Sequence, residues 1–369
     1  MKLALIRRQF SATGGAELYL QRLLRALAAR GHELHLYAEA WGELPEQVAV
    51  HRIEADGSRA SRAQRFAYSV QTALIDQKFD CVFSLERTVR QDVYRAGDGL
   101  HRVWLQRRRQ FAPWWKKAFI GRGAFHRAMM ELESQTFDSW NTRHIIVNSE
   151  MVKREILQHF RFPENRLHLV RNGIAVEAFQ RGDREQARAR FGLKPEDFAL
   201  LFVGSGWERK GLRYLFDTLR LIDKLRALSE VKGRPVKLLV AGRGQAPVNT
   251  PENVTFLGPL PDVENAYAAA DLFTFLPIYE PSANVCFEAL AAGLPVITTR
   301  FNGASEVLEE GVTGSVLYDP SDILAVAEKI IYWMSHPPPR PLPLEADLGL
   351  DRNVTETLAV LELAAQEKL

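Results

Sequence analysis

The stretch "DLFTFLPIYEPSANVCFEALAAGLPVITT", residues 271–299, contains a complete strand–helix–strand unit. Asp271–Phe275 is an apolar run of strand length, Pro281 precedes a helical pattern that begins near Ser282–Asn284, and the run "LPVITT" closes the unit. Proline is favoured at the start of a helix, which separates the strand from the helix. A strand that returns through a helix predicts a parallel neighbour in the same sheet.

The same alternation extends over the rest of the chain. The other predicted strands cover residues 2–6, 33–37, 80–85, 144–149, 198–204, 235–242 and 253–258. Between the first two strands, a helix that stops at Gly31 is predicted from one apolar face made of Leu20, Leu23, Leu24 and Leu27. Alternating strands and helices predict an α/β fold, with parallel sheets that carry helices on both faces.

Two series of this kind, each beginning with a strand and a glycine-containing loop, predict two doubly wound, Rossmann-like domains. We expect the first at residues 1–170 and the second at residues 171–345, with the boundary near Arg171–Gly173. The segment "HPPPRPLPLE", residues 336–345, is predicted to be an extended linker because proline is excluded from helix interiors. Residues 346–369 are predicted to form a final helix that packs back on the first domain.

The composition excludes several classes of protein. The 369 residues, 46% of them hydrophobic, suffice for about two domains, and a net charge of +3 demands no nucleic-acid partner. Cys81 and Cys286 are the only cysteines, which suits a reducing compartment. The first apolar run is too short for a signal peptide, and no run reaches the roughly 20 residues of a membrane-spanning helix. We therefore expect a cytoplasmic protein.

Two glutamates lie where such a fold binds ligands, at the carboxyl end of a strand. Glu280 lies in front of the predicted helix, and Glu288 lies on its second turn. A carboxylate accepts two hydroxyl hydrogen bonds at once, which suits a sugar at Glu280 and a ribose diol at Glu288. The spacing of the two glutamates is common by chance, so their position in the fold carries the prediction.

The loop after the first strand of each domain suits a phosphate. Gly14 and Gly15 precede a helix, where backbone N–H groups can approach an anion, and a tight turn is the alternative. Arg209 and Lys210 can neutralise a diphosphate whose charge grows as it leaves, and a solvated basic loop is the alternative. The chain has no G-x-G-x-x-G and no G-x-x-x-x-G-K-[ST], so the dinucleotide and P-loop readings lose their support.

No metal site is predicted. The chain has no C-x-x-C, H-E-x-x-H or D-x-D, and its nine histidines are scattered. A diphosphate site without a metal needs helix ends and basic side chains, which the two loops can supply. We therefore expect no metal and no bound cofactor.

Six stretches, in the same order, resemble the retaining nucleotide-sugar glycosyltransferases of family 4. They are "GGAELYLQRLLRALAARGHELHLY", "VNSEMVKREI", "VRNGIAVEAF", "VGSGWERKGLRYLFDTL", "AAADLFTFLPIYEPSANVCFEALAAGLPVITT" and "NGASEVLEEGVTGSVL". The resemblance covers nearly the whole chain and implies the GT-B fold, in which two Rossmann-like domains face a central cleft. It also implies a metal-independent hexosyltransferase with a nucleotide-sugar as co-substrate.

The resemblance assigns roles to the site residues. It implies Glu280 at the donor sugar and Glu288 at the nucleotide ribose. Around the donor diphosphate it implies Gly14, Gly15, Arg209, Lys210 and the backbone of Asn284 and Val285. The implied catalytic residues are Glu280, Asp98, Lys210 and Arg209. Asp98 would act as base or orienter of the acceptor hydroxyl, with His101 a weaker candidate and a plain turn residue the alternative. The family usually has a Gly-Phe-Gly-like stretch where this chain has "PSAN", residues 281–284, so the identity of the donor sugar stays open.

A basic and aromatic segment, "HRVWLQRRRQFAPWWKKAFIGRGAFHR", covers residues 101–127 and holds eight Lys or Arg and no acid. One predicted helical stripe, typical of a helix in an anionic membrane interface, contains Phe111, Trp114, Trp115, Ala118 and Phe119. The residues expected at the membrane or the acceptor are Trp104, Arg107, Arg108, Arg109, Trp114, Trp115, Lys116 and Lys117. RNA binding, or a buried amphipathic helix with a basic outer face, would explain the same pattern.

Within the family, the lipopolysaccharide inner-core glucosyltransferases resemble this chain in length and in a basic aromatic segment at this place. That resemblance implies transfer of a hexose, glucose from UDP-glucose, to a lipid-linked oligosaccharide such as the lipopolysaccharide core. We expect a nucleotide-sugar, a lipid-linked glycan acceptor and an anionic membrane surface as partners, no nucleic acid, and a peripheral position on the inner face of the cytoplasmic membrane. The alternatives are another donor and glycan, a nucleotide-sugar 2-epimerase, and a non-enzymatic module that binds anionic surfaces.

Overall fold

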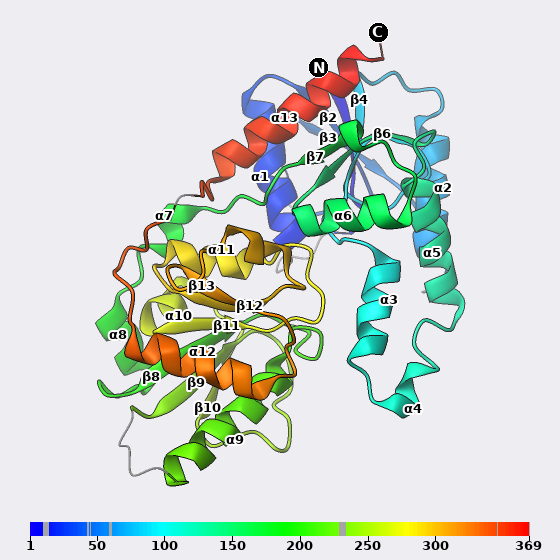
Figure 1. Ribbon diagram of the computed structural model, residues 1–369. Helices are drawn as coiled ribbons and strands as arrows, with labels where there is room; N and C mark the ends of the chain where they lie inside the picture. The colour runs from blue at the N-terminus through cyan, green and yellow to red at the C-terminus, as the bar shows by residue number, and fades with distance from the viewer. Residues whose placement is uncertain are drawn as a thin grey trace. The chain divides into compact units, whose positions relative to one another are not determined.

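The computed structural model describes residues 1–9, 15–42, 44, 46–58, 61–228, 234–344 and 346–368 (Figure 1). The chain divides into two compact units, Met1–Arg171 with Asp351–Leu369, and Asn172–Leu350. Each unit is built on its own parallel sheet.

The first unit contains a seven-stranded sheet in the order β3-β2-β1-β4-β5-β6-β7, in which neighbouring strands are parallel. Its strands are β1 (Lys2–Ile6), β2 (Glu33–Ala38), β3 (Val48–Arg52), β4 (Cys81–Ser84), β5 (Gln91–Arg95), β6 (Thr142–Val147) and β7 (Leu167–Leu169). Its helices are α1 (Gly15–Ala29), α2 (Arg62–Leu74), α3 (His101–Gln110), α4 (Trp114–Lys117), α5 (Ala124–Thr136), α6 (Glu150–His159), the 3-10 turn η1 (Glu164–Arg166) and α13 (Leu350–Gln366).

The second unit contains a six-stranded parallel sheet in the order β10-β9-β8-β11-β12-β13. Its strands are β8 (Phe198–Val203), β9 (Val236–Ala241), β10 (Val254–Gly258), β11 (Leu272–Phe275), β12 (Val296–Thr299) and β13 (Gly314–Leu317). Its helices are α7 (Val176–Phe179), α8 (Arg184–Arg190), α9 (Leu212–Leu228), α10 (Glu264–Ala269), α11 (Asn284–Ala291), the 3-10 turn η2 (Gly303–Val307) and α12 (Ile323–Ser335).

The predicted α/β class with two parallel sheets is confirmed, and the apolar runs named from the sequence form central strands and the edge strand β10. Leu5 of β1 and Leu200 of β8 have no exposed surface, because helices cover both faces of a parallel sheet. The prediction did not name β3, β7 and β13, which are edge strands of their sheets, nor the internal strand β5, whose sequence QDVYR has only two apolar residues. Edge strands bury less surface, so their sequences carry a weaker apolar signal.

Residues Asp351–Leu369, most of them in the last helix, α13, belong to the first unit although they follow the second unit in sequence. Figure 1 shows this helix, in red, beside α1, and Arg30, the residue directly after α1, donates a 3.2 Å hydrogen bond to Thr355 of α13. At the far end of the helix, Lys368 lies 3.0 Å from the carboxylate of Asp92. The helix is therefore tied to the first unit near both of its ends.

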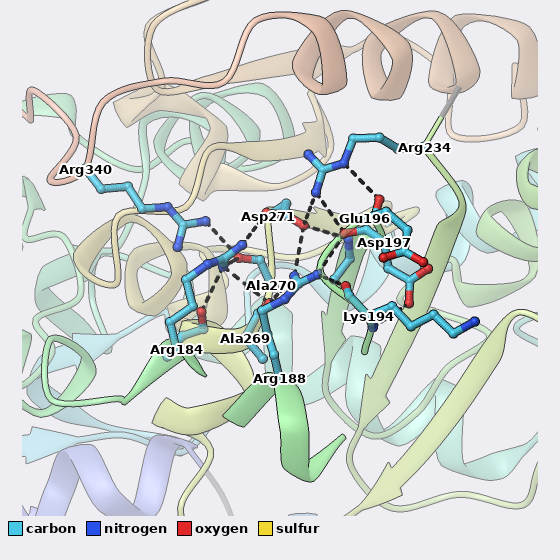
Figure 2. A network of polar contacts seen from close by, with 12 residues as sticks. Arg184, Arg188, Lys194, Glu196, Asp197, Arg234, Ala269, Ala270, Asp271 and Arg340 are labelled. Carbon is cyan, nitrogen blue, oxygen red and sulfur yellow. Dashed lines mark hydrogen bonds and ion pairs between the residues drawn. The ribbon is translucent and has the colours of Figure 1, made fainter. Parts of the chain in front are cut away.

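An arginine network, shown in Figure 2, joins several elements of the second unit around Asp271, directly before β11. The Asp271 carboxylate accepts from Arg184 at 2.6 Å, from Arg188 at 3.3 Å and from the backbone N–H of Ala199 at 2.8 Å. Arg184 also donates to the carbonyl groups at the C-terminal end of α10, where the helix dipole favours a cation. The network lies at the amino ends of the strands, the edge opposite to the predicted ligand site.

Candidate functional site

Three loops meet at the carboxyl edge of the second unit's sheet, after β8, β11 and β12. The backbone N–H of Ile278 donates to the carbonyl of Arg209 at 3.0 Å, which joins the first two loops. The N–H of Glu280 donates to the carbonyl of Phe301 at 2.8 Å, which joins the second to the third. A Cβ atom on Gly211 would lie 1.8 Å from the carbonyl oxygen of Leu276, so only glycine permits this approach. The loops form one connected surface.

The structure brings the predicted residues Glu280 and Arg209 into direct contact. The Nη1 atom of Arg209 lies 2.6 Å from Oε2 of Glu280 and also donates to the carbonyl of Tyr279 at 3.2 Å. The Glu280 side chain is 17% exposed and that of Arg209 is 37% exposed, so both can still reach a ligand. The pair fixes the carboxylate at the end of β11.

Lys210 lies beside this ion pair and is partly buried. Its ammonium group sits 5.7 Å from the centre of the Phe275 ring. Burial lowers the pKa of Lys210 below that of an ordinary lysine, although the nearby charge of Glu280 acts in the opposite direction. A Cβ atom on Gly204 would lie 2.5 Å from the Lys210 nitrogen, so the glycine leaves room for this side chain. A partly desolvated cation is well suited to stabilise a diphosphate charge.

Glu288 lies on the second turn of α11, and its carboxylate accepts a 2.8 Å hydrogen bond from the hydroxyl of Tyr267. Tyr267 belongs to α10 and is fully buried. Burial, and then the charge of Glu288, raise the pKa of Tyr267 well above its ordinary value, so the phenol stays protonated and acts as a donor. The sequence reasoning missed Tyr267, because nothing in its local pattern links it to Glu288.

The first residues of α11 are Asn284 and Val285, which the sequence predicts at a diphosphate. The first N–H groups of a helix have no partner within the helix, and the helix dipole favours an anion there. Ala283, at the N-cap, has no polar side chain with which to occupy those groups. The fully buried Asn302 holds this end of the helix by accepting from the N–H of Ala283 at 3.1 Å. Asn302 is a second residue that the sequence reasoning missed.

Asp98 belongs to the first unit, where it is exposed in the turn between β5 and α3. Arg87 donates a 2.6 Å hydrogen bond to the carbonyl of Gly99 and so holds this turn. His101 begins α3, and its Nε2 atom lies 3.0 Å from Nδ1 of His126. Burial, and then the charge of Arg87, lower the pKa of His101 to about 4, so its imidazole is neutral near pH 7. Asp98 is therefore the charged candidate for the acceptor at this edge.

The predicted glycine loop is described only in part. Gly14 lies outside the described residues. Gly15 is the first residue of α1, directly after that part of the chain. A phosphate role for the two glycines stays a prediction.

The single helical stripe predicted in the basic aromatic segment is wrong. Helix α3 ends at Gln110, and the four-residue helix α4 begins only at Trp114. Pro113 separates them, because proline disfavours a helical conformation in the preceding residue, Ala112, and lacks the N–H that would continue the ladder. Phe111 and Trp114 therefore do not lie on one helix.

Three aromatic side chains of this segment are nevertheless exposed, which contradicts a buried amphipathic helix over residues 114–119, whereas α3 buries Val103 and Leu105. Trp114 is 81% exposed, Trp115 56% and Phe119 72%. Lys116 and Lys117 are exposed beside them, as is Arg108 on α3, whereas Trp104 is partly buried. We call residues 111–119 the aromatic tip.

Two of the predicted membrane arginines make contacts inside the segment. Arg109 donates from Nε and Nη2 to the carbonyl of Ile120, at 3.1 and 2.8 Å, and so ties the end of α3 to the chain that returns from the aromatic tip. Arg107 donates to the side chain of Gln110 at 3.0 Å. Arg109 thus shapes the segment as well as adding to its charge.

Among the described residues, no group of three or more His, Cys, Asp or Glu side chains is arranged to hold a metal ion. Within the same part of the chain, no helix combines the length and the apolar character needed to cross a membrane.

Comparison with known proteins matches both units. The family described as "Glycosyltransferase Family 4" matches residues 13–178, and the family described as "Glycosyl transferases group 1" matches residues 197–336. The chain is 25% identical over 322 residues to "Lipopolysaccharide glucosyltransferase WaaG" of Escherichia coli (strain K12), covering 83% of this chain and 82% of that protein. It is 30% identical over 190 residues to "D-inositol 3-phosphate glycosyltransferase" of Mycobacterium marinum, covering 47% of this chain and 38% of that protein.

Solved structures share the fold over the whole chain. The crystal structure of WaaG superimposes with a TM-score of 0.76 at 22% identity and covers 99% of this chain and 98% of that one. The structure of Anabaena Alr3699/HepE in complex with UDP and glucose superimposes with a TM-score of 0.65 at 19% identity, over 99% and 95% of the two chains. Both likenesses concern the GT-B fold, which has two α/β domains.

Proposed function

The chain belongs to the family 4 nucleotide-sugar glycosyltransferases, with the GT-B fold, and from this premise we propose that it transfers glucose from UDP-glucose to a lipid-linked oligosaccharide. The observation that carries the donor half of the proposal is the contact between Arg209 and Glu280 beside the partly buried Lys210. Two cations and a carboxylate at one strand edge suit a sugar diphosphate, in which an anionic leaving group is attached to a polar ring.

In this proposal the second unit binds the donor. Glu288, oriented by Tyr267, accepts hydrogen bonds from the ribose, and Glu280 accepts hydrogen bonds from the sugar hydroxyls. The backbone N–H groups of Asn284 and Val285 face the diphosphate from the N-terminal start of α11. The complex of the HepE neighbour with UDP and glucose supports UDP-glucose as the donor.

Arg209 and Lys210 stabilise the charge that develops on the diphosphate. An arginine has five N–H donors, so Arg209 can hold Glu280 and a phosphate oxygen together. The bond from the sugar C1 atom to the diphosphate oxygen breaks, and a bond from C1 to the acceptor oxygen forms on the same face. The acceptor proton passes to the departing phosphate oxygen. The protein contributes position and charge, and in our proposal it does so without a metal ion.

The first unit takes the acceptor in this proposal. Asp98 orients the acceptor hydroxyl, with His101 beside it as a neutral donor or acceptor. The name of the WaaG relative supports a lipopolysaccharide-type acceptor, which is held in a membrane. The exposed Trp114, Trp115 and Phe119, with Lys116 and Lys117, support a peripheral position on an anionic membrane surface, on the cytoplasmic side where nucleotide-sugars are made.

The proposal is tested by the release of UDP from UDP-glucose, with and without a lipid-linked core oligosaccharide and with EDTA present. We expect release that depends on the acceptor and persists in EDTA. Release from GDP- or ADP-sugars alone would show that the donor carries another base. Release that EDTA abolishes would show that the reaction needs a metal ion. A nucleotide-sugar epimerase would convert the donor without the acceptor, and a non-enzymatic module would release nothing.

A further inference from the structure

The side chain of Asn172, at the start of the second unit, makes hydrogen bonds to the N-terminal start of α11. Its Nδ2 atom donates to the side-chain oxygen of Asn284 at 2.7 Å and to the backbone carbonyl of Ser282 at 3.1 Å. The two acceptors lie on either side of the N-cap residue of α11. One amide group therefore holds the place where the helix begins, from a position 112 residues away in the sequence.

Asn302 holds the same place from within the unit. Its Oδ1 atom accepts from the backbone N–H of Ala283, and its Nδ2 atom donates to Thr298 at 3.0 Å. The start of α11 is thus fastened by Asn302 through the N–H of the N-cap residue and by Asn172 through the residues next to it. Loss of either amide removes one of these two attachments.

The bond from Asn172 also decides which way the Asn284 amide faces. Because Nδ2 of Asn172 is a donor, it must meet the carbonyl oxygen of the Asn284 side chain. The NH2 group of Asn284 is then the group that this side chain presents to a further partner. An NH2 group beside the first N–H groups of a helix adds a donor to a site that favours anions.

We propose that Asn172 is a positioning residue for the diphosphate of the donor: it sets the place of the first turn of α11 and the orientation of the Asn284 amide. The inference rests on the proposed function, which puts the donor diphosphate at that turn. Its physical reason is that a displacement of roughly 1 Å at a binding group can cost about 100-fold in rate. Asn172 does not touch the reacting atoms in this account and acts through α11.

The test measures the affinity of the whole protein for UDP and for UMP by calorimetry, in the wild type and in Asn172→Ala, Asn172→Asp and Asn284→Ala. UMP lacks the outer phosphate of UDP, so the ratio of the two affinities isolates that phosphate. We expect each variant to lower the ratio of UDP to UMP affinity by roughly tenfold, and the double variant N172A/N284A to lower it no further, since the two residues act as a unit. Asn172→Asp keeps the shape but places a carboxylate against two oxygens.

Asn253→Ala is the matched control. The Nδ2 atom of Asn253 also donates twice, to Asp223 at 3.1 Å and to the carbonyl of Val236 at 3.0 Å, but at the amino edge of the same sheet. We expect this variant to lower Tm about as much as Asn172→Ala and to leave the affinity ratio unchanged. A merely structural role for Asn172 would give the two variants the same behaviour.

The outcomes separate the inference from the function on which it rests. A wild-type protein that binds UDP, with an unchanged UDP to UMP ratio in the Asn172 and Asn284 variants, overturns the inference alone. A wild-type protein that binds neither nucleotide overturns the proposed function and the inference together. A ratio that falls in Asn253→Ala as well returns Asn172 to a general role in stability.

Discussion

The hydroxyl of Tyr267 and the carboxylate of Glu288 are 2.8 Å apart, and the tyrosine is fully buried while the glutamate is only half-buried. A buried donor with no competing water holds the carboxylate in one orientation. The pair thus links α10 to the second turn of α11 and points a charged acceptor toward the site.

Tyr267→Phe tests the orientation of Glu288. Loss of a hydrogen bond to a charged group costs about 1.5–3 kcal/mol, so we expect UDP affinity to fall by roughly tenfold or more. Calorimetry with UDP measures the change. Tyr214→Phe is the control, because the Tyr214 hydroxyl also has a charged partner, Arg213 at 2.6 Å, on α9. Equal losses in both variants would mean that the change spreads through the unit's core.

Glu280→Gln separates sugar chemistry from nucleotide binding. The proposal places this charge at the sugar, so turnover falls while UDP still binds. Removal of one electrostatic contact of this type lowers kcat by about 100- to 1,000-fold. Steady-state rates with UDP-glucose and calorimetry with UDP give the two quantities. UDP affinity that falls as steeply as kcat would place Glu280 at the nucleotide.

Lys210→Met should raise the stability of the protein and lower its activity. Burial lowers the pKa of Lys210 in the folded protein below its unfolded value, so the charged lysine costs stability at every pH below the folded pKa. That cost fades as the pH rises from the folded to the unfolded pKa. We therefore expect a higher Tm for the variant at pH 7, a gain that shrinks toward pH 10, and a kcat/KM lower by about 100- to 1,000-fold. An unchanged kcat/KM would return Lys210 to the solvated basic loop.

The pH dependence of kcat/KM in the wild type should also reflect the lowered pKa of Lys210. Since the protonated lysine neutralises the diphosphate, kcat/KM falls on the alkaline side, with a midpoint below the ordinary lysine value of 10.5. Lys210→Arg keeps its charge in that range, and the alkaline fall should disappear. A fall that persists in the arginine variant belongs to another group.

Asp271→Asn tests the arginine network of Figure 2. The Asp271 side chain is 13% exposed, and its loss leaves Arg184 and Arg188 close together without their carboxylate. Breaking a buried ion pair costs about 3–5 kcal/mol, so the urea midpoint should fall clearly. Asp262→Asn removes the partner of Arg190 in an exposed pair and should leave the midpoint nearly unchanged. Similar midpoints for both variants would show that the network adds little.

Replacement of Trp114 and Trp115 by Ser tests the aromatic tip. We expect the wild type to sediment with vesicles that contain anionic lipid, to be released as salt rises, and to stay in solution with neutral vesicles. The double variant loses apolar insertion and should bind less even at low salt. Trp140→Ser is the control, since Trp140 is 90% exposed in the loop between α5 and β6. Short RNA that displaces the protein at lower concentration than lipid would favour nucleic acid instead.

The sequence predicts most of the central strands, and it names Glu280 and Arg209, which the structure brings into contact, because these signals are local. Apolar runs, Pro281 and the position of Glu280 before a helix are all visible within about ten residues. Tyr267 and Asn172 could not be found in that way, since they act on residues 21 and 112 positions away. Such partners depend on how strands are ordered in the sheet, which a single sequence does not display.

The single helix predicted in the basic aromatic segment is wrong for a local reason, because Pro113 interrupts it. Pro113 favours a break in the helix, whereas the spacing of the aromatic residues on either side of it favours one continuous helix. Trp114 begins the four-residue helix α4, Phe119 lies two residues after it, and both rings are exposed. The correct signal was the backbone restriction rather than the side-chain period.

The hydrogen bonds from Arg109 to the carbonyl of Ile120 join the two ends of the loop formed by residues 110–119. A loop closed at its neck is an exchangeable module, because the scaffold meets the same two ends whatever lies between them. Substitutions within residues 110–119 should therefore leave the sheet unchanged. A chimaera that carries another protein's loop between Arg109 and Ile120 should keep its nucleotide specificity and adopt the surface preference of the loop's source.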